Sequence, residues 1–335
     1  MKQRGFTLVE LMISIVLFSI AMGGVLSVAV SIAQGFREQR AAIATEAQAR
    51  MPMDFITDAI RQAGPAAPSS AYACTPQPGC LPANTTIQDV VTCEVGALNV
   101  TNSTAGPDTL TLLYASGAAV TATLAPYGAG ITSLPVGDAS QLSAGDMILI
   151  SNLSQAHTVT VTAVNYGTNT LTLAGQACGS INWPGGGTYP TYSTVVRVKR
   201  ATFSIVANTP GIVPADGIPV LMFDPDGAGP AAAEPLAEGV EDMQVALGVD
   251  VNGNGVIDAG EWAFDTAGHG ALTGPILSAK IVLVSRATTI VEGGNATPFQ
   301  EPVALDHQAP LNGPDVWRRR VLEATIEIRN GANSP

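Results

Sequence analysis

One stretch of twelve residues carries oxygen-bearing side chains at the spacing of a calcium-binding loop. In DVNGNGVIDAGE, such side chains occupy positions 1, 3, 5, 9 and 12, Gly255 occupies position 6, and position 7 supplies a backbone carbonyl. Ca²⁺ prefers about six to eight oxygen ligands, and the glycine permits the sharp turn that wraps them around one point. The pattern predicts a calcium site formed by Asp250, Asn252, Asn254, Val256, Asp258 and Glu261.

The segment before this loop, VEDMQVALGV, has the composition of a strand and does not fit the helix of an EF-hand. We therefore expect a calcium loop between strands, with an affinity made modest by two neutral asparagine ligands. A metal-free hairpin that uses Asn-Gly turns is the alternative. A second acidic stretch, with Asp224 and Asp226, lacks the later ligands, and a solvated turn is expected there.

The four cysteines all follow the apolar N-terminal segment. An even number of cysteines in an exported domain predicts two disulfides, because an oxidising compartment favours them. A short loop from Cys74 to Cys80 would leave Cys93 and Cys178 for a long-range bond, but three pairings are open. The spacing does not fit a zinc site.

No residues in the sequence form a motif that pairs a nucleophile with a base. The three histidines, His157, His269 and His307, lie outside every metalloprotease or hydrolase pattern. We therefore expect no enzymatic activity and no catalytic residue. The formal net charge of -12 also argues against a nucleic-acid partner, which requires clustered Lys and Arg.

The N-terminal segment has the length and composition of a membrane span. Residues 11–33 are apolar or small and uncharged, and about 20 such residues cross a bilayer as a helix. Lys2 and Arg4 precede them, so the positive-inside rule places residues after about 36 outside the cytoplasm. Glu10 needs a partner of opposite charge, because a carboxylate at membrane depth is costly.

The residues Gly5-Phe6-Thr7-Leu8-Val9-Glu10 resemble the processing site of type IV pilins and type II secretion pseudopilins. The resemblance implies that a prepilin peptidase cuts after Gly5, that the new N-terminal Phe6 is methylated, and that the apolar helices form a filament core. It also implies that Glu10 pairs with the Phe6 amine of a neighbouring subunit. Glu10 lies four residues from that amine, about one helical turn. A plain membrane anchor is the alternative.

The helical pattern continues beyond the membrane segment and stops near Gly64-Pro65. Pro52 predicts a kink or a break, because proline lacks an N–H and clashes with the preceding turn. The expected organisation is a leader at 1–5, a transmembrane and filament-core helix at 6–34, and a periplasmic continuation at 35–64. An apolar stripe is expected from Ile43, Ala47, Phe55, Ile56, Ala59 and Ile60.

Residues 65–335 are expected to form a β-rich globular domain. Short runs of Val, Ile, Thr and Leu alternate with Gly, Pro, Asn and Asp turns. A β-rich insertion is expected at about 118–178, with a hairpin turn at NYGTN. The predicted fold class is α+β, with a long N-terminal helix followed by a mostly antiparallel β-sheet domain.

The segments VVRVKRATFSI, AEGVEDMQVALGVDVNGNG, AKIVLVSR and DVWRRRVLEATIEIRN, in this order, are similar to the PilW-like minor pilins. The resemblance implies a minor pilin that helps to initiate the type IV pilus and sits near its tip. It would lie in the bacterial inner membrane with a periplasmic domain, and then in the filament at the cell surface. Its partners would be other minor and major pilins, the prepilin peptidase and a tip adhesin. A type II secretion pseudopilin and a pilin-anchored adhesin are the alternatives.

The resemblance leaves two parts of the chain without an assigned role. The middle, roughly residues 70–185, matches no segment of the family that we recognise. The run Arg318-Arg319-Arg320 is interpreted either as a contact for an anionic partner or as a solvated charge run before the last strand.

Overall fold

The computed structural model describes residues 8–64, 98–128, 130–152, 156–174, 188–206, 217–225, 232–264, 276–287, 304–307 and 317–328. One long helix is followed by mostly antiparallel strands, so the predicted α+β class is confirmed. The processing residues Gly5 and Phe6 lie outside the described residues, as do the disulfide candidates Cys74, Cys80, Cys93 and Cys178.

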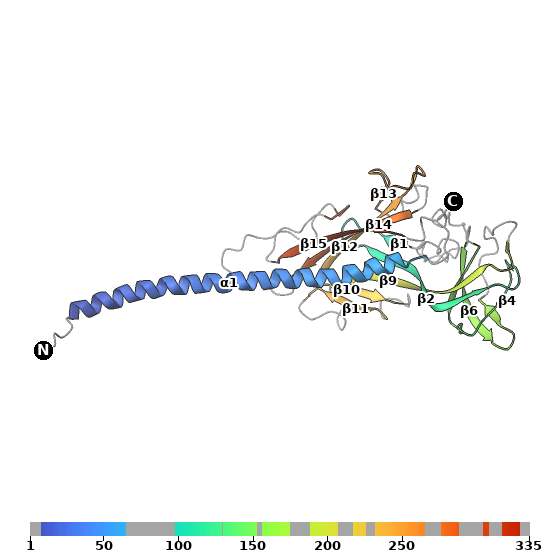
Figure 1. The fold of residues 1–335 in the computed structure, drawn as a ribbon, viewed down its shortest axis with the longest axis horizontal. Helices are drawn as coiled ribbons and strands as arrows, with labels where there is room; N and C mark the ends of the chain where they lie inside the picture. The colour runs from blue at the N-terminus through green and yellow to red at the C-terminus, as the bar shows by residue number, and fades with distance from the viewer. Residues whose placement is uncertain are drawn as a thin grey trace.

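Helix α1 (Leu8–Arg61) extends far beyond the β domain, so its first half projects alone from one end of the molecule (Figure 1). The helix runs through Pro52 to Arg61, and the break considered at this proline does not occur. Met53 and Ile56, which follow the proline, are buried in the core. Their packing holds the last turns in helical conformation despite the missing hydrogen bond at Pro52.

The helix ends where the sequence predicts. Gly64 has a φ of 66°, a left-handed conformation that glycine adopts without strain. Its N–H donates to the carbonyl of Leu113 at 2.8 Å, and Ala63 forms an isolated bridge with Tyr114. The end of the helix is therefore hydrogen-bonded directly to the sheet.

The strands form two larger sheets and one small pair. The nine-stranded sheet has the order β1-β2-β9-β5-β6-β7-β4, with β10 on β9 and β11 on β10; the four-stranded sheet has the order β13-β12-β14-β15, and β3 pairs with β8. Their bounds are β1 (Leu98–Thr101), β2 (Thr109–Ala122), β3 (Tyr127–Gly128), β4 (Ser133–Pro135), β5 (Met147–Ser151), β6 (Ala156–Asn165), β7 (Thr170–Leu173), β8 (Thr188–Tyr189), β9 (Thr194–Val206), β10 (Val220–Asp224), β11 (Glu234–Glu238), β12 (Val240–Val249), β13 (Trp262–Ala263), β14 (Ile276–Arg286) and β15 (Arg319–Glu327).

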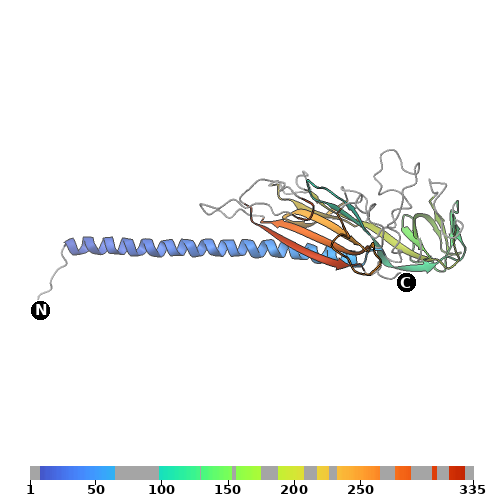
Figure 2. The same cartoon turned by 90° about the horizontal axis from the view of Figure 1, so that it is seen from above.

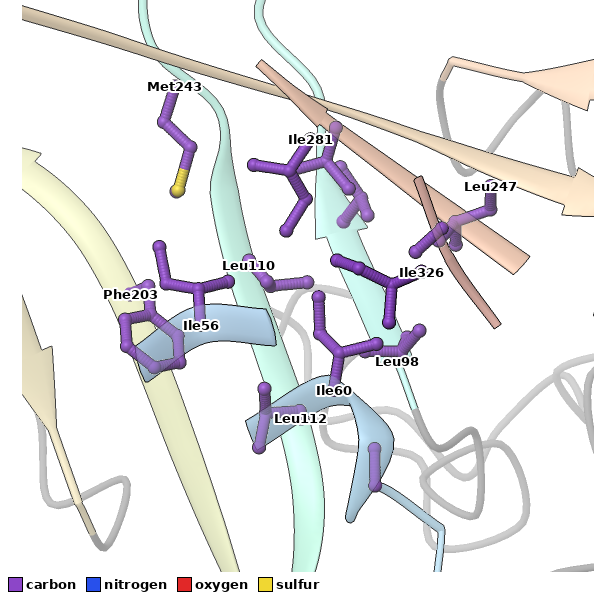
Figure 3. Packing of buried hydrophobic residues seen from close by; sticks show 14 of the residues in the cluster. Ile56, Ile60, Leu98, Leu110, Leu112, Phe203, Met243, Leu247, Ile281 and Ile326 are labelled. Carbon is purple, nitrogen blue, oxygen red and sulfur yellow. The ribbon is translucent and has the colours of Figure 1, made fainter. Parts of the chain in front are cut away.

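One hydrophobic core joins the last turns of α1 to both larger sheets (Figure 3). Ile56 and Ile60 are fully buried there, as predicted, but Ile43 and Ala47 are exposed. The buried face instead consists of Thr45, Ala49, Pro52, Met53, Ile56, Ile60 and Ala63. The apolar stripe predicted from hydrophobicity was therefore partly wrong. Small and polar residues, Thr45 and Ala49, occupy the N-terminal part of the buried helix face.

The strands within residues 118–178 extend the nine-stranded sheet away from α1 (Figures 1 and 2). The expected hairpin is present, since β6 pairs with β7 from Asn165 and Thr170 onward. These strands have a second core that includes Tyr127, Leu134 and Ile148. They are nevertheless hydrogen-bonded to the rest of the sheet, because β5 pairs with β9.

Gly248→Ala is expected to lower the free energy of unfolding by about 1–3 kcal/mol, the usual cost of forcing extra volume into a packed core. A Cβ at Gly248 would lie 2.5 Å from Oγ of Ser278 and 2.9 Å from Cγ1 of Ile257. Gly260→Ala is the matched control, because a Cβ there meets nothing within 4 Å. Urea unfolding of the full-length protein in detergent measures both; equal losses would contradict the packing argument.

Candidate functional site

The first half of α1 presents an apolar surface that no other part of the described chain covers. Leu8–Arg37 has a mean hydropathy of 2.4, and none of its most apolar window is buried. Large side chains there, such as Leu8, Phe18 and Ile20, are all more than half exposed. A helix of this length and composition can cross a bilayer.

Two serines of this half bond to the preceding turn of the helix, and Glu10 is the one charged residue among residues 8–36. Ser14 Oγ donates to the carbonyl of Glu10 at 2.7 Å, and Ser19 Oγ donates to the carbonyl of Ile15 at 2.8 Å. Such bonds to the preceding turn make serine compatible with an apolar environment. Glu10 lies in the first turn of α1, the end where the helix dipole favours a negative charge.

The predicted calcium loop connects two paired strands. β12 precedes it and β13 follows it, with Gly248 opposite Trp262 in the register. The N–H of Val249 donates to the carbonyl of Glu261 at 2.8 Å, which closes the base of the loop. The segment before the loop is therefore a strand, as the sequence predicts, and every residue of β12 is buried.

The two ends of the loop are organised around buried carboxylates. Asp250 is 4% exposed and accepts from the N–H groups of Gly253 at 2.7 Å and Gly255 at 2.8 Å. Glu261 is 7% exposed and accepts from the N–H groups of Val251 at 3.0 Å and Asp258 at 2.9 Å. The carboxylates at positions 1 and 12 therefore both point into the loop.

The predicted ligands in the middle of the loop also converge. Nδ2 of Asn252 and Nδ2 of Asn254 lie 3.0 Å and 3.3 Å from the same oxygen, Oδ2 of Asp258. Gly253 and Gly255 have φ values of 72° and 78°, which their missing Cβ permits. Within the described residues, however, no three Asp, Glu, His or Cys side chains are grouped closely enough to hold a metal as they stand.

The other acidic residues and histidines considered in the sequence analysis lie outside the loop at residues 250–261. Asp224 ends strand β10 and is 5% exposed, so the expectation of a solvated turn was wrong for this residue; Asp226 lies outside the described residues. His307 is buried, with Nδ1 2.8 Å from Oδ2 of Asp242. His269 lies outside the described residues, and His157 is placed only as a member of β6.

Two family models match the chain. Residues 1–26 match the prokaryotic N-terminal methylation motif, and residues 202–330 match type IV pilus-assembly protein W. The second match includes β14 and β15, two of the strands against which α1 packs. The two matches support a PilW-like pilin. No curated protein sequence matches it at a significant level.

Neither family model covers residues 27–201, which include most of α1 and the sheet extension. In this PilW-like pilin the methylation motif coincides with the exposed apolar half of the helix. That coincidence fits a membrane-anchored pilin, because the motif and the membrane-length helix belong to the same segment. The loop at residues 250–261 lies within the region matched to protein W.

A buried ion pair beside this sheet was missed by the sequence analysis. Arg319, interpreted above as a surface residue, donates from Nε to Oε2 of Glu241 at 2.5 Å and from Nη2 to Oε1 at 3.1 Å. Its side chain is 3% exposed, and that of Glu241 is 7% exposed. Neither interpretation of the arginine run therefore holds for Arg319, which links β15 to β12 inside the pilin domain.

A second buried polar group ties the segment after β1 to β12. Both oxygens of Asp108 accept backbone hydrogen bonds at 2.8 Å, from Ser103 and from Val245. Burial, together with the nearby carboxyls of Asp306 and Asp242, raises the pKa of this carboxyl to about 7, although the two hydrogen bonds oppose the shift. Asp108 is therefore a carboxyl whose charge opposes folding.

The Asp108 contribution to the stability of the pilin is expected to fall as the pH rises from about 4 to about 7. The folded state holds a proton on this carboxyl that the unfolded state has released, so folding is favoured below the unfolded pKa and the contribution is lost as the pH passes the folded value. Urea unfolding across this range should show a flatter profile for Asp108→Asn. The exposed Asp138→Asn is the control, and an unchanged profile in Asp108→Asn would contradict the assignment.

Proposed function

We propose that this pilin is a minor pilin that, with other minor pilins, starts growth of the type IV pilus and remains near the tip. The observation that carries the proposal is the apolar half of α1, whose surface no other part of the described chain covers. Apolar surface of this extent requires an apolar environment. The bacterial inner membrane provides it before assembly, with the β domain in the periplasm, and the helices of other pilins provide it in the filament at the cell surface.

The proposed assembly contact uses the residues at the start of the chain. Cleavage after Gly5 by a prepilin peptidase would create an amine on Phe6, which lies one turn from Glu10. In the apolar core of a filament, this amine would need a carboxylate from a neighbouring pilin. Pairing of Glu10 with that amine would set the axial register of the subunit.

The β domain would supply the lateral contacts with other minor and major pilins and with a tip adhesin. The chain acts in this proposal by binding and positioning, so it requires no catalytic residue. The exposed side chains of β15, which include Arg320 on one face and Glu323 and Glu327 on the other, offer both signs of charge for such contacts. Complementary charges of this kind favour one partner and one orientation over others.

The proposal is tested by the N-terminal peptide mass of the protein extracted from membranes, with and without the prepilin peptidase of the host. We expect a chain that begins at methylated Phe6 only when the peptidase is present. A chain that begins at Met1 in both strains would reduce the first 35 residues to a plain anchor and would overturn the proposal.

A deletion strain then separates the pilus from the type II secretion system. Loss of the minor pilin should reduce surface pili and twitching motility while enzyme export continues. Normal pili with defective export would instead assign the chain to the pseudopilins. Complementation with the wild-type chain controls for effects of the deletion on neighbouring genes.

A second candidate role, adhesion, is favoured by the position of the sheet extension. The strands β4 and β6 lie at the end of the molecule opposite the N-terminus (Figure 1), with exposed aromatic side chains at Tyr166 and Tyr192. Aromatic side chains of this kind are frequent contacts in binding surfaces. Tyr166→Ala with Tyr192→Ala should reduce attachment of piliated cells to a surface without reducing the number of pili; unchanged attachment would exclude this role.

A further inference from the structure

We propose that the loop at residues 250–261 binds one Ca²⁺ ion through side-chain oxygens at positions 1, 3, 5, 9 and 12 and the backbone carbonyl of Val256. The complete positional pattern of the sequence is the first observation behind this proposal. The structure adds two others, the convergence of the side chains at positions 3, 5 and 9 and the charge of the loop. The proposal does not depend on the role of the chain in a pilus.

The side chains at positions 3, 5 and 9 already meet at one point. Asn252 and Asn254 come from the first half of the loop and Asp258 from the second half, yet both amide groups lie within 3.3 Å of one oxygen of Asp258. A half-turn of each amide about χ2 exchanges its nitrogen and oxygen. Both amide oxygens would then leave the N–H groups of Asn254 and Val256, from which they now accept, and would face the same point as the carboxylate. Three oxygen ligands would come together there, and the cation would replace the two hydrogen bonds that are lost.

The charges of the loop also favour a cation. Asp250, Asp258 and Glu261 are all acidic, and no Lys, Arg or His of the described chain forms an ion pair with any of them. Asp250 and Glu261 are nevertheless 4% and 7% exposed. Buried carboxylates in proteins are usually paired with a cation or coordinate a metal. The N–H groups of the loop satisfy their hydrogen bonds but do not neutralise three negative charges.

The chemistry of the ligands selects calcium over other metals. All of the proposed ligands are oxygens of carboxylates, amides and a carbonyl, which suit hard cations, and the loop offers no thiolate or imidazole. Mg²⁺ demands a nearly ideal octahedron and keeps several waters, whereas a twelve-residue loop with a carboxylate at position 12 suits Ca²⁺. The two neutral asparagines favour a dissociation constant of about 10⁻⁴ M, the range of extracellular calcium modules.

The test uses the full-length protein in detergent, stripped of metal with a chelator. Tb³⁺ replaces Ca²⁺ in oxygen sites and emits when a nearby tryptophan is excited, and Trp262 directly follows Glu261. We expect Tb³⁺ emission that Ca²⁺ reverses, and one binding event per chain in a calorimetric Ca²⁺ titration. Glu261→Gln should weaken the affinity by at least about tenfold, because it removes the charged ligand at position 12.

Glu234→Gln is the matched control, since it makes the same chemical change at an exposed position of β11 and should bind as the wild type does. If Glu261→Gln does not fold, Asn254→Ala replaces it, because Asn254 is an exposed proposed ligand. Absence of binding to the wild-type chain at about 10 mM Ca²⁺, a concentration above the range of such modules, would overturn the proposal. Equal affinities of the wild type and the position 12 or position 5 variant would also overturn it, because the ion would then lie elsewhere.

Discussion

Glu241→Ala is expected to lower the free energy of unfolding of the pilin by about 3–5 kcal/mol, because it leaves a buried arginine without its carboxylate. Arg319 is the arginine concerned, and its guanidinium makes two hydrogen bonds to Glu241. Arg286 adds a second positive charge, with Nη1 3.8 Å from Oε1 of Glu241. The Arg286 guanidinium also lies 4.7 Å from the centre of the Trp317 ring. Removal of the one carboxylate would therefore leave two partly or fully buried cations close together.

Urea unfolding of the full-length protein in detergent, followed by tryptophan fluorescence, measures this loss. Glu323→Ala is the control, since the Glu323 carboxylate lies 3.3 Å from Nζ of Lys280 but is 56% exposed. An exposed pair contributes about 0–1 kcal/mol, because water solvates both charges well. Similar losses of unfolding free energy in the two variants would show that the buried Glu241 pair stabilises the fold no more than the exposed Glu323 pair does.

The sequence predicted those features of the fold that depend on local pattern. The helix ends at a glycine that needs a positive φ, the strand before the acidic loop is continuous, and the hairpin after β6 turns at the predicted residues. Polar and apolar residues alternate along the last strand of the sequence, and Ile326 and Ile328 are buried with Glu327 exposed between them. In each case the signal lies within a few neighbouring residues, so it needs no knowledge of what packs against them.

Local sequence patterns did not predict the burial of residues whose partners lie far away in the chain. Glu241 and Arg319 are 78 positions apart, so nothing near the arginine run indicates that one of its members is buried. The helix stripe was partly wrong for the same reason, since Ala49 is buried in the domain whereas the more hydrophobic Ile43 is exposed. Asp108 likewise gives no local sign of its burial beside Met243 and Val245.

The proposed calcium loop illustrates both cases. Its proposed ligands lie within twelve consecutive residues, and the amides of Asn252 and Asn254 lie beside Asp258 in the structure. The sequence could not indicate how the two terminal carboxylates are satisfied when they face the N–H groups of their own loop. Whether these carboxylates bind an ion depends on a competition between the N–H groups and the cation, which spacing does not describe.

Glu10→Leu is expected to reduce incorporation of the pilin into filaments by at least about tenfold, while cleavage after Gly5 continues. In the proposed assembly, removal of Glu10 leaves the Phe6 amine of a neighbour without a counter-charge in an apolar core. Loss of one partner from a buried ion pair costs about 3–5 kcal/mol, which corresponds to more than about a hundredfold in an equilibrium constant. The lower bound on the expected effect allows for partial solvation of the amine at the end of the helix.

Sheared filaments and membranes, probed with an antibody to a C-terminal tag, measure the share of the pilin in each fraction. Ser19→Ala is the control, because Ser19 lies in the same apolar half and its hydroxyl bonds only to the carbonyl of Ile15 one turn back. The peptide mass must show a chain that begins at Phe6 in both variants, so that a defect in processing is distinguished from a defect in assembly. Wild-type incorporation of cleaved Glu10→Leu would show that the apolar surface of α1 alone sets the register, and the charge pair would then have no part in assembly.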